Sequence, residues 1–132
     1  MKKALILGCS HAAGSELGIE KFARANSYPA LVAQMLGYDV LNMSIPGGSN
    51  DAIFRIFLDK KDDCDIIIVA WSGLNRSEIV YNNEWINILP GSSPPKELIS
   101  YYQQWCLYGS DERFGRLNKI KNVIALNSLS FV

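Results

Sequence analysis

The chain has 132 residues, enough for a single domain that buries its own core, and its 48% hydrophobic and 20% charged content is typical of a globular protein. Thirteen basic residues balance thirteen acidic ones and are scattered along the chain, which excludes the strongly basic surface of a protein that binds nucleic acid or an anionic membrane. We therefore expect one domain over 1–132, with no nucleic-acid partner and no membrane partner.

Cysteine and histidine usage limits the cofactor and the compartment. The three cysteines are widely spaced and follow no metal-ligand pattern, and there is one histidine, so the sequence predicts no metal and no cofactor. We interpret these cysteines as reduced thiols in a reducing compartment. The first apolar run is too short for a signal-peptide core, and no run approaches the ~20 apolar residues of a membrane span. We expect a cytoplasmic protein.

The first predicted element is a buried strand over 4–7, which ends at Gly8 and is followed by small and polar residues. In open α/β sheets, ligands bind at the carboxyl ends of the strands. Ser10 is therefore a candidate functional residue, with its hydroxyl and backbone N–H facing a crevice. The alternative is that Ser10 is only a turn former or a helix cap.

A helix and a second strand come next, after a polar, mobile-looking stretch over 15–26. Pro29 suits the first turn of a helix that begins at 27, and Gly37 suits its C-terminal cap. The second strand is predicted over 38–45. The apolar residues that share one face of the helix at three- and four-residue spacing are Leu31, Val32, Met35 and Leu36.

The next helix begins at 49–51, where hydroxyl, amide and carboxylate groups can cap it, and its predicted buried stripe is Ile53, Ile56 and Phe57. A charged turn over 59–63 ends this helix, and an uninterrupted apolar run follows over 66–71. Such runs are typical of parallel sheets that are covered on both faces. Three strands separated by helices predict right-handed βαβ units.

The remaining sequence is less regular. Residues 78–89 mix aromatic, amide and acidic side chains without clean periodicity, and 90–95 indicates a long turn. Two helices are predicted after it, over 96–108 and around 114–124. A doubly wound domain normally continues with another strand after such a helix, so we expect a C-terminal truncation. Either that final strand is missing, or residues 130–132 are a remnant of it.

Three polar clusters follow the three predicted strands, at 8–11, 46–50 and 72–76. Because the carboxyl ends of parallel strands meet at one edge of a sheet, these clusters should converge. Each cluster is a weak signal by itself, since a Gly-Gly pair also makes a tight turn and an asparagine also caps helices. Their joint placement indicates a binding or catalytic site.

Together these motifs resemble the SGNH (GDSL-type) hydrolase superfamily of esterases, lipases and carbohydrate acetyl-esterases. Gly8-Cys9-Ser10 stands where that family has its nucleophile block Gly-Asp-Ser. The segment from Asn42 to Gly47 matches the spacing of the second block. Gly73-Leu74-Asn75-Arg76 matches three of the four positions of the third block, Gly-X-Asn-Asp, although a shift by one residue would put Ser72 at the glycine position. The resemblance covers roughly residues 4–76.

The resemblance implies a three-layer α/β/α sandwich around a flavodoxin-like parallel sheet, with ester hydrolase activity. Ser10 would be the nucleophile, and the N–H groups of Ser10 and Gly47 would form the oxyanion hole with the Asn75 amide. The substrate would be a small-molecule or carbohydrate ester. The residues expected to line its pocket are His11, Gly48, Ser72, Gly73 and Arg76.

Two departures from the family pattern bear on activity. Cys9 replaces the aspartate of the first block, and the chain has no Asp-X-X-His block to supply the catalytic base. His11 is adjacent to Ser10, and neighbouring side chains that leave a turn usually diverge, which makes it a poor base. We therefore expect the chain to be incomplete or inactive as it stands, which a truncation would explain.

Two non-enzymatic alternatives use the same fold. The first is a module that binds a small polar ligand in the crevice, and the second is an assembly domain whose aromatic segment 79–95 forms an interface. A sheet cut to three or four strands leaves an edge and an apolar face uncovered, so we also expect a homo-oligomer.

Several large or charged side chains have two interpretations. Arg76 and Glu78 either orient a polar substrate or pair with each other on the surface. Trp71 is either core or pocket wall. The aromatic residues that either stack on a carbohydrate or fill the core are Trp85, Trp105, Tyr101 and Tyr102.

Overall fold

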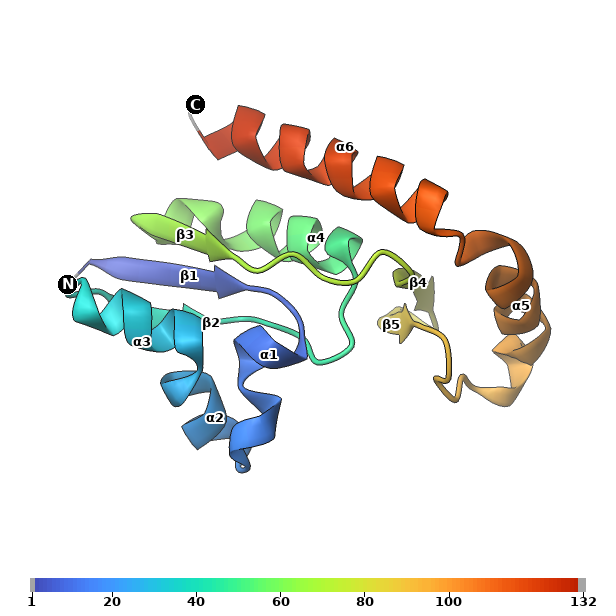
Figure 1. Ribbon diagram of the computed structural model, residues 1–132, viewed down its shortest axis with the longest axis horizontal. Helices are drawn as coiled ribbons and strands as arrows, with labels where there is room; N and C mark the ends of the chain where they lie inside the picture. The colour runs from blue at the N-terminus through green and yellow to red at the C-terminus, as the bar shows by residue number, and fades with distance from the viewer. Residues whose placement is uncertain (1, 131–132) are drawn as a thin grey trace.

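The computed structural model describes residues 2–130. Strands and helices alternate through the first half of the chain, and a hairpin and two helices form the second half (Figure 1). Of the expected strand remnant at 130–132, Ser130 belongs to the last helix, and residues 131–132 lie outside the described residues. The elements are β1 (Lys3–Leu7), α1 (Ser10–Ala13), α2 (Glu20–Asn26), α3 (Tyr28–Met35), β2 (Asp39–Asn42), α4 (Asn50–Lys60), β3 (Ile66–Val69), β4 (Ser77–Tyr81), β5 (Glu84–Ile88), α5 (Ile99–Gln104) and α6 (Glu112–Ser130), with 3₁₀ turns at Ser15–Leu17, Lys61–Asp63 and Lys96–Leu98 and a π-helical turn at Trp105–Gly109.

The centre of the fold is a three-stranded parallel sheet in the order β2-β1-β3. Parallel strands joined by helices confirm the predicted mixed α/β class. Two strands are shorter than predicted, because 38–45 contributes only Asp39–Asn42 and 66–71 only Ile66–Val69. β1 lies in the middle, so strands cover both its edges and its residues 4–7 are fully buried.

Helices pack against both faces of this sheet (Figure 1). Leu5 points to the face that carries α4, where it belongs to one apolar cluster with Ile53 and Phe57. The predicted stripe of that helix is therefore confirmed. Ile6 points to the opposite face, because successive side chains of a strand alternate, and packs there with Ala30 of α3.

The buried face of α3 is not the predicted one. Its large apolar side chains face outward, with Met35 87% exposed, while Ala30 and Ala33 are fully buried. Small side chains let the helix backbone approach the sheet closely. The stretch 15–26 before α3, which looked mobile in the sequence, forms a 3₁₀ turn and α2. The exposed apolar side chains of α3 and its C-terminal end are Tyr28, Leu31, Val32, Met35 and Leu36.

The irregular-looking stretch 78–89 is an antiparallel hairpin of β4 and β5. Its two turn residues, Asn82 and Asn83, have φ angles of 49° and 64°, which is the left-handed conformation that a tight hairpin turn requires. The hairpin contacts α4 through Arg55, whose Nε and Nη2 each donate to a carboxylate oxygen of Glu78 at 2.9 Å. Arg55 also stacks on the ring of Trp85, at 4.4 Å from its centroid.

Residues 96–108 are helical, as predicted, and lead into α6. α6 packs on α4, where Asp51 accepts hydrogen bonds from the side-chain amides of Asn118 and Asn122. Among residues 2–130, no helix combines the length and the apolar character that crossing a bilayer requires. The outward face of α6 carries the exposed apolar residues Phe114, Leu117, Ile120 and Ile124.

We predict that Gly115→Ala destabilises the protein by about 1–3 kcal/mol, even though alanine is the better helix former by about 1 kcal/mol. Gly115 is buried where α6 touches the loop after β3, and an added Cβ would overlap the carbonyl group of Leu74. Urea unfolding of this variant measures the change. Asn127→Ala, at an exposed position of α6, is the control and should change stability by less than about 0.5 kcal/mol. A Gly115→Ala protein as stable as wild type would contradict this packing.

Candidate functional site

The three predicted polar clusters lie at the same edge of the sheet, as the loops that follow β1, β2 and β3. Backbone hydrogen bonds hold them there. The Ile45 N–H donates to the Gly8 carbonyl at 2.9 Å, which joins the second loop to the first. The Ala70 N–H donates to the Leu7 carbonyl at 2.8 Å, which joins the start of the third loop to β1.

The second and third loops are also joined through buried side chains. The Asn50 side chain accepts from the Ser72 N–H at 2.7 Å and donates to the Ser72 carbonyl at 3.4 Å. The Ser72 hydroxyl donates to the Gly48 carbonyl and accepts from Nη1 of Arg76 at 3.1 Å. Of the residues predicted to bind substrate, Ser72 therefore contacts both Gly48 and Arg76, and these contacts fix the shape of the two loops.

Asn42, at the end of β2, fixes the first loop. Its amide nitrogen donates to the Ala12 carbonyl of α1 at 2.8 Å and to the Ser27 hydroxyl at 3.1 Å. Its amide oxygen accepts from the Ser44 N–H at 3.1 Å. Arg24 of α2 reinforces this arrangement by donating to the carbonyls of Asn42 and Ser44. The sequence singled out Asn42 only for its spacing to Gly47, and the structure gives it a role in positioning α1.

Ser10 is the first residue of α1 and is half-buried. Cys9, not Ser10, occupies the N-cap position, and no side chain caps this helix. Among residues 2–130 we find no hydrogen bond of the Ser10 hydroxyl. The helix-cap alternative therefore does not account for Ser10, and its hydroxyl is available for another contact.

The two other predicted oxyanion-hole residues are Gly47 and Asn75. Gly47 has a φ of 72°, a conformation that side-chain-bearing residues rarely adopt, so the turn after β2 requires glycine at this position. Asn75 is exposed, and its Oδ1 lies beside Gly73, at 3.5 Å from the place where a Cβ would be. Ser72 is buried and turned toward Gly48, whereas Gly73 is exposed next to Asn75.

His11 extends away from the protein, with a side chain that is 81% exposed. Its Nδ1 lies 4.0 Å from Oε2 of Glu16, which is also exposed. Glu16 comes close because α1 ends at the left-handed Gly14 and a 3₁₀ turn follows at once, a local effect that periodicity does not reveal.

Three cavities lie beside α1, beyond the end of β2 and along the edge of β3, and none of the three is lined by Ser10, Gly47 or Asn75. One of about 300 Å³, next to α1, is lined by Ala13, Ser15 and Pro46 among others. One of about 780 Å³ lies at the edge of β2, and one of about 660 Å³ lies at the edge of β3. Within residues 2–130, no group of three His, Cys, Asp or Glu side chains is placed to hold a metal ion.

The aromatic and charged side chains for which the sequence left two interpretations do not gather at one place, and each makes its own contacts. Glu78 pairs with Arg55, whereas Arg76 donates to Ser72, so the interpretation in which Arg76 and Glu78 pair on the surface is wrong. Trp85 stacks with Arg55, whereas Trp105 is buried and stacks with Tyr102 at 6.3 Å between ring centroids. Trp71 is half-buried and packs against the cluster beneath α4.

We compared the chain with protein-family models, with curated proteins and with solved structures, and none of the three comparisons finds a match.

Proposed function

We propose that this protein is an SGNH-like serine ester hydrolase domain, with Ser10 as its nucleophile. The observation that carries the proposal is the joining of three loops at one sheet edge, the first of which contains a serine whose hydroxyl has no partner among residues 2–130. We propose in addition that the domain is a three-layer α/β/α sandwich with flavodoxin-like strand order. The helices on both faces and the order β2-β1-β3 support this.

In the proposed reaction the Ser10 hydroxyl oxygen attacks the carbonyl carbon of an ester and its proton passes to a base. The bond to the alcohol oxygen then breaks as the base returns the proton to that oxygen, which leaves an acyl group on Ser10. Water hydrolyses this acyl-serine to the free acid and restores the Ser10 hydroxyl. The N–H groups of Ser10 and Gly47 and the amide of Asn75 would stabilise the negative charge on the carbonyl oxygen. Removing one such donor typically lowers the rate about 10²–10³-fold.

The proton acceptor is the missing part of this site. His11 is the one histidine of the chain, and it points outward beside Glu16. We therefore propose that the chain by itself is acylated slowly and turns over poorly. The substrate class is a small-molecule or carbohydrate ester, and the unpaired, half-buried state of all three cysteines supports a cytoplasmic setting.

A fluorophosphonate probe, which reacts with nucleophilic serines, tests the proposal. Wild type should be labelled, and Ser10→Ala should lose the label. Ser15→Ala changes an exposed serine in the following turn and should be labelled like wild type. Asn75→Ala should slow labelling about 100-fold. Added imidazole should accelerate hydrolysis of p-nitrophenyl acetate by wild type beyond the protein-free rate, which imidazole raises by itself, because it supplies the absent base; Ser10→Ala should show no excess over the protein-free rate. An unlabelled wild type, or equal labelling of Ser10→Ala, would overturn the proposal.

A second candidate is a non-catalytic assembly module of the same fold. The observation that favours it is the set of hydrogen bonds among Gly48, Ser72 and Arg76, which gives these side chains structural partners. This candidate predicts no labelling of Ser10 and no ester hydrolysis with imidazole. The same experiment therefore separates the two functions.

A further inference from the structure

The cleft beyond the end of β2 is a second place where this protein can hold a small molecule. Its volume of about 780 Å³ is within the range of clefts that bind ligands. Its walls come from α2, α4, the segment that follows β2 and the β4–β5 hairpin. Ser10, Gly47 and Asn75 do not line it, so binding in this cleft does not require a reactive Ser10.

Trp85 gives the cleft an aromatic wall. The side chain is 53% exposed, although Arg55 covers part of the ring from 4.4 Å. The two hydrogen bonds from Arg55 to Glu78 hold this guanidinium in place, so the indole is positioned before a ligand arrives. An exposed indole offers a flat apolar face and one N–H donor, which suits a ring-shaped ligand with a polar rim.

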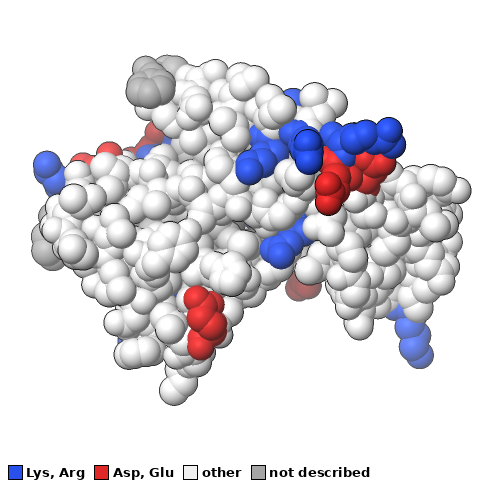
Figure 2. Space-filling model, viewed as in Figure 1, with Lys and Arg blue, Asp and Glu red and all other residues white. Residues whose placement is uncertain are grey.

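The charged groups of the cleft balance one another. Helices α2 and α4 each contribute one carboxylate and one guanidinium, from Glu20 with Arg24 and from Asp59 with Arg55. Arg24 pairs with Glu20 at 3.0 Å, and Asp59 pairs with Lys60 at 2.9 Å. Acidic and basic side chains also lie side by side near the start of α6, on the face that Figure 2 draws. A charged ligand would find no uncompensated opposite charge in the cleft to offset its desolvation, which favours a neutral ligand.

Several polar atoms of these groups are free to bind a ligand. Among residues 2–130, Nη1 of Arg55, Oε2 of Glu20 and Oδ1 of Asp59 make no hydrogen bond. The cleft therefore combines donors and acceptors with an exposed aromatic ring. Sugar hydroxyls both donate and accept, and the C–H face of a sugar ring is apolar, so a sugar can use both parts of the cleft.

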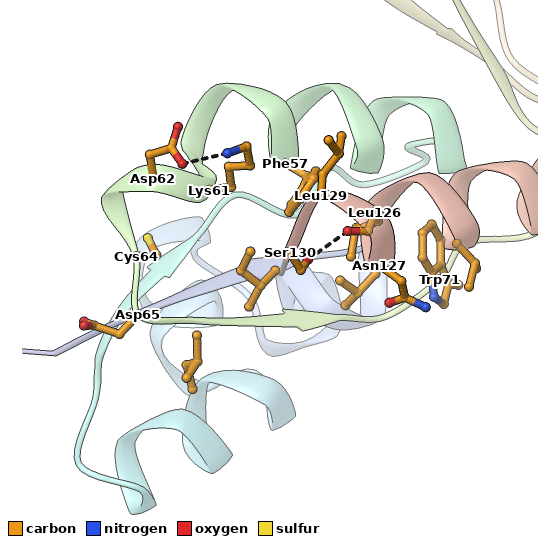
Figure 3. A pocket seen from close by; sticks show the side chains of 14 residues that line it. Phe57, Lys61, Asp62, Cys64, Asp65, Trp71, Leu126, Asn127, Leu129 and Ser130 are labelled. Carbon is orange, nitrogen blue, oxygen red and sulfur yellow. Dashed lines mark hydrogen bonds and ion pairs between the residues drawn. The ribbon is translucent and has the colours of Figure 1, made fainter. Parts of the chain in front are cut away.

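The other large cavity, along β3, lacks this combination. Figure 3 shows Phe57 and Trp71 on its walls. Phe57 is fully buried, and Trp71 packs against the same apolar cluster beneath α4. Their rings are thus part of the core, whereas Trp85 leaves much of its ring uncovered.

We propose that the cleft beyond β2 binds a neutral oligosaccharide, with one sugar ring stacked on Trp85 and hydroxyls hydrogen-bonded to the free polar atoms of α2 and α4. The balanced charge favours a neutral ligand over a charged one. The mixture of donors and acceptors favours hydroxyls, which act as both, over the edge of a nucleobase, whose donors and acceptors are fixed in position.

Isothermal titration calorimetry with three neutral oligosaccharides, cellotetraose, maltotetraose and tri-N-acetylchitotriose, tests the proposal. At least one of them should bind wild type. Raising the salt concentration should leave its affinity unchanged, because the ligand carries no charge. Adenosine is a neutral planar competitor and should not bind. A protein that binds none of the three sugars, or that binds adenosine in their place, would overturn the proposal.

Replacing Trp85 tests the stacking. Trp85→Ala should weaken sugar binding at least about tenfold, and Trp85→Tyr, which keeps an aromatic ring, should retain most of the affinity. Val80→Ala is the matched control, because Val80 lies opposite Trp85 in the hairpin and is 57% exposed but does not line the cleft. It should bind the sugar like wild type. Circular dichroism verifies that the variants are folded, and unchanged binding by Trp85→Ala would contradict the stacking.

Tryptophan fluorescence locates the bound sugar. Of the three tryptophans, Trp85 is exposed, Trp71 is half-buried and Trp105 is buried. A saturating sugar should protect wild type from quenching by acrylamide, and Trp85→Tyr should lose this protection while it still binds the sugar. Quenching that the sugar leaves unchanged would place the ligand elsewhere and overturn the proposal.

Neither measurement uses ester turnover, so the two proposals fail separately. A protein that binds the sugar but leaves Ser10 unlabelled by the fluorophosphonate probe would support the carbohydrate cleft and overturn the hydrolase. A protein that is labelled at Ser10 but binds none of the three sugars would do the reverse.

Discussion

Replacing Phe57 with alanine is expected to lower the free energy of unfolding by about 3–5 kcal/mol. Phe57 is fully buried in α4 and belongs to the apolar cluster that joins this helix to Leu5 and Leu7 of β1. Its ring also stacks on that of Phe54, with 6.0 Å between the centroids. Alanine would remove these contacts and leave a cavity that the surrounding strands and helices can fill only in part.

Urea or thermal unfolding followed by circular dichroism measures this loss. Leu58→Ala is the matched control, because Leu58 neighbours Phe57 in the same helix but is 48% exposed. Its expected cost is below about 1 kcal/mol. Similar costs for the two variants would mean that α4 does not pack on the sheet through this face.

Replacing Asn42 with alanine is expected to lower the free energy of unfolding by about 2–4 kcal/mol, because each buried group that loses its hydrogen bond costs about 1–3 kcal/mol. The Asn42 amide holds the Ala12 carbonyl, the Ser27 hydroxyl and the Ser44 N–H. Without it, the end of α1 is no longer tied to β2. We therefore expect slower labelling of Ser10 by the fluorophosphonate probe, in addition to lower stability.

Asn26→Ala is the control for this effect, since its side-chain amide makes one exposed hydrogen bond, to the Phe22 carbonyl. It should cost less than about 1 kcal/mol and leave labelling unchanged. Asn42→Asp retains the acceptor for Ser44 but loses the donor to Ala12, so its stability should also fall below that of wild type. A stable Asn42→Ala protein would show that α1 is held by other contacts.

The contrast between α3 and α4 shows where periodicity predicts packing and where it does not. Both helices carry apolar residues at helical spacing. In α4 the predicted residues Ile53 and Phe57 are buried, but in α3 the large residues such as Met35 are exposed and the alanines are buried. The alanines of α3 let its backbone approach the sheet closely, and the sequence of the helix does not state which of its faces meets the sheet.

The candidate site, too, was predicted only in part from the sequence. The sequence predicted that three loops would meet at one sheet edge, because the carboxyl ends of parallel strands must lie together. It did not predict the contacts of Asn42 with α1 or of Asn50 with Ser72, which join residues 30 and 22 positions apart. The hairpin of β4 and β5 was also missed, although the Asn82-Asn83 pair is a turn signal for it.

The three parallel strands, the α4 core stripe and the shared edge of the loops were determined by the sequence alone, because each depends on local patterns of apolar and turn residues. The tertiary structure alone decided which face of α3 is buried and which side chains the loops use to hold one another. Those features depend on contacts between residues far apart in the chain, and a local pattern in the sequence does not show which distant residues come into contact.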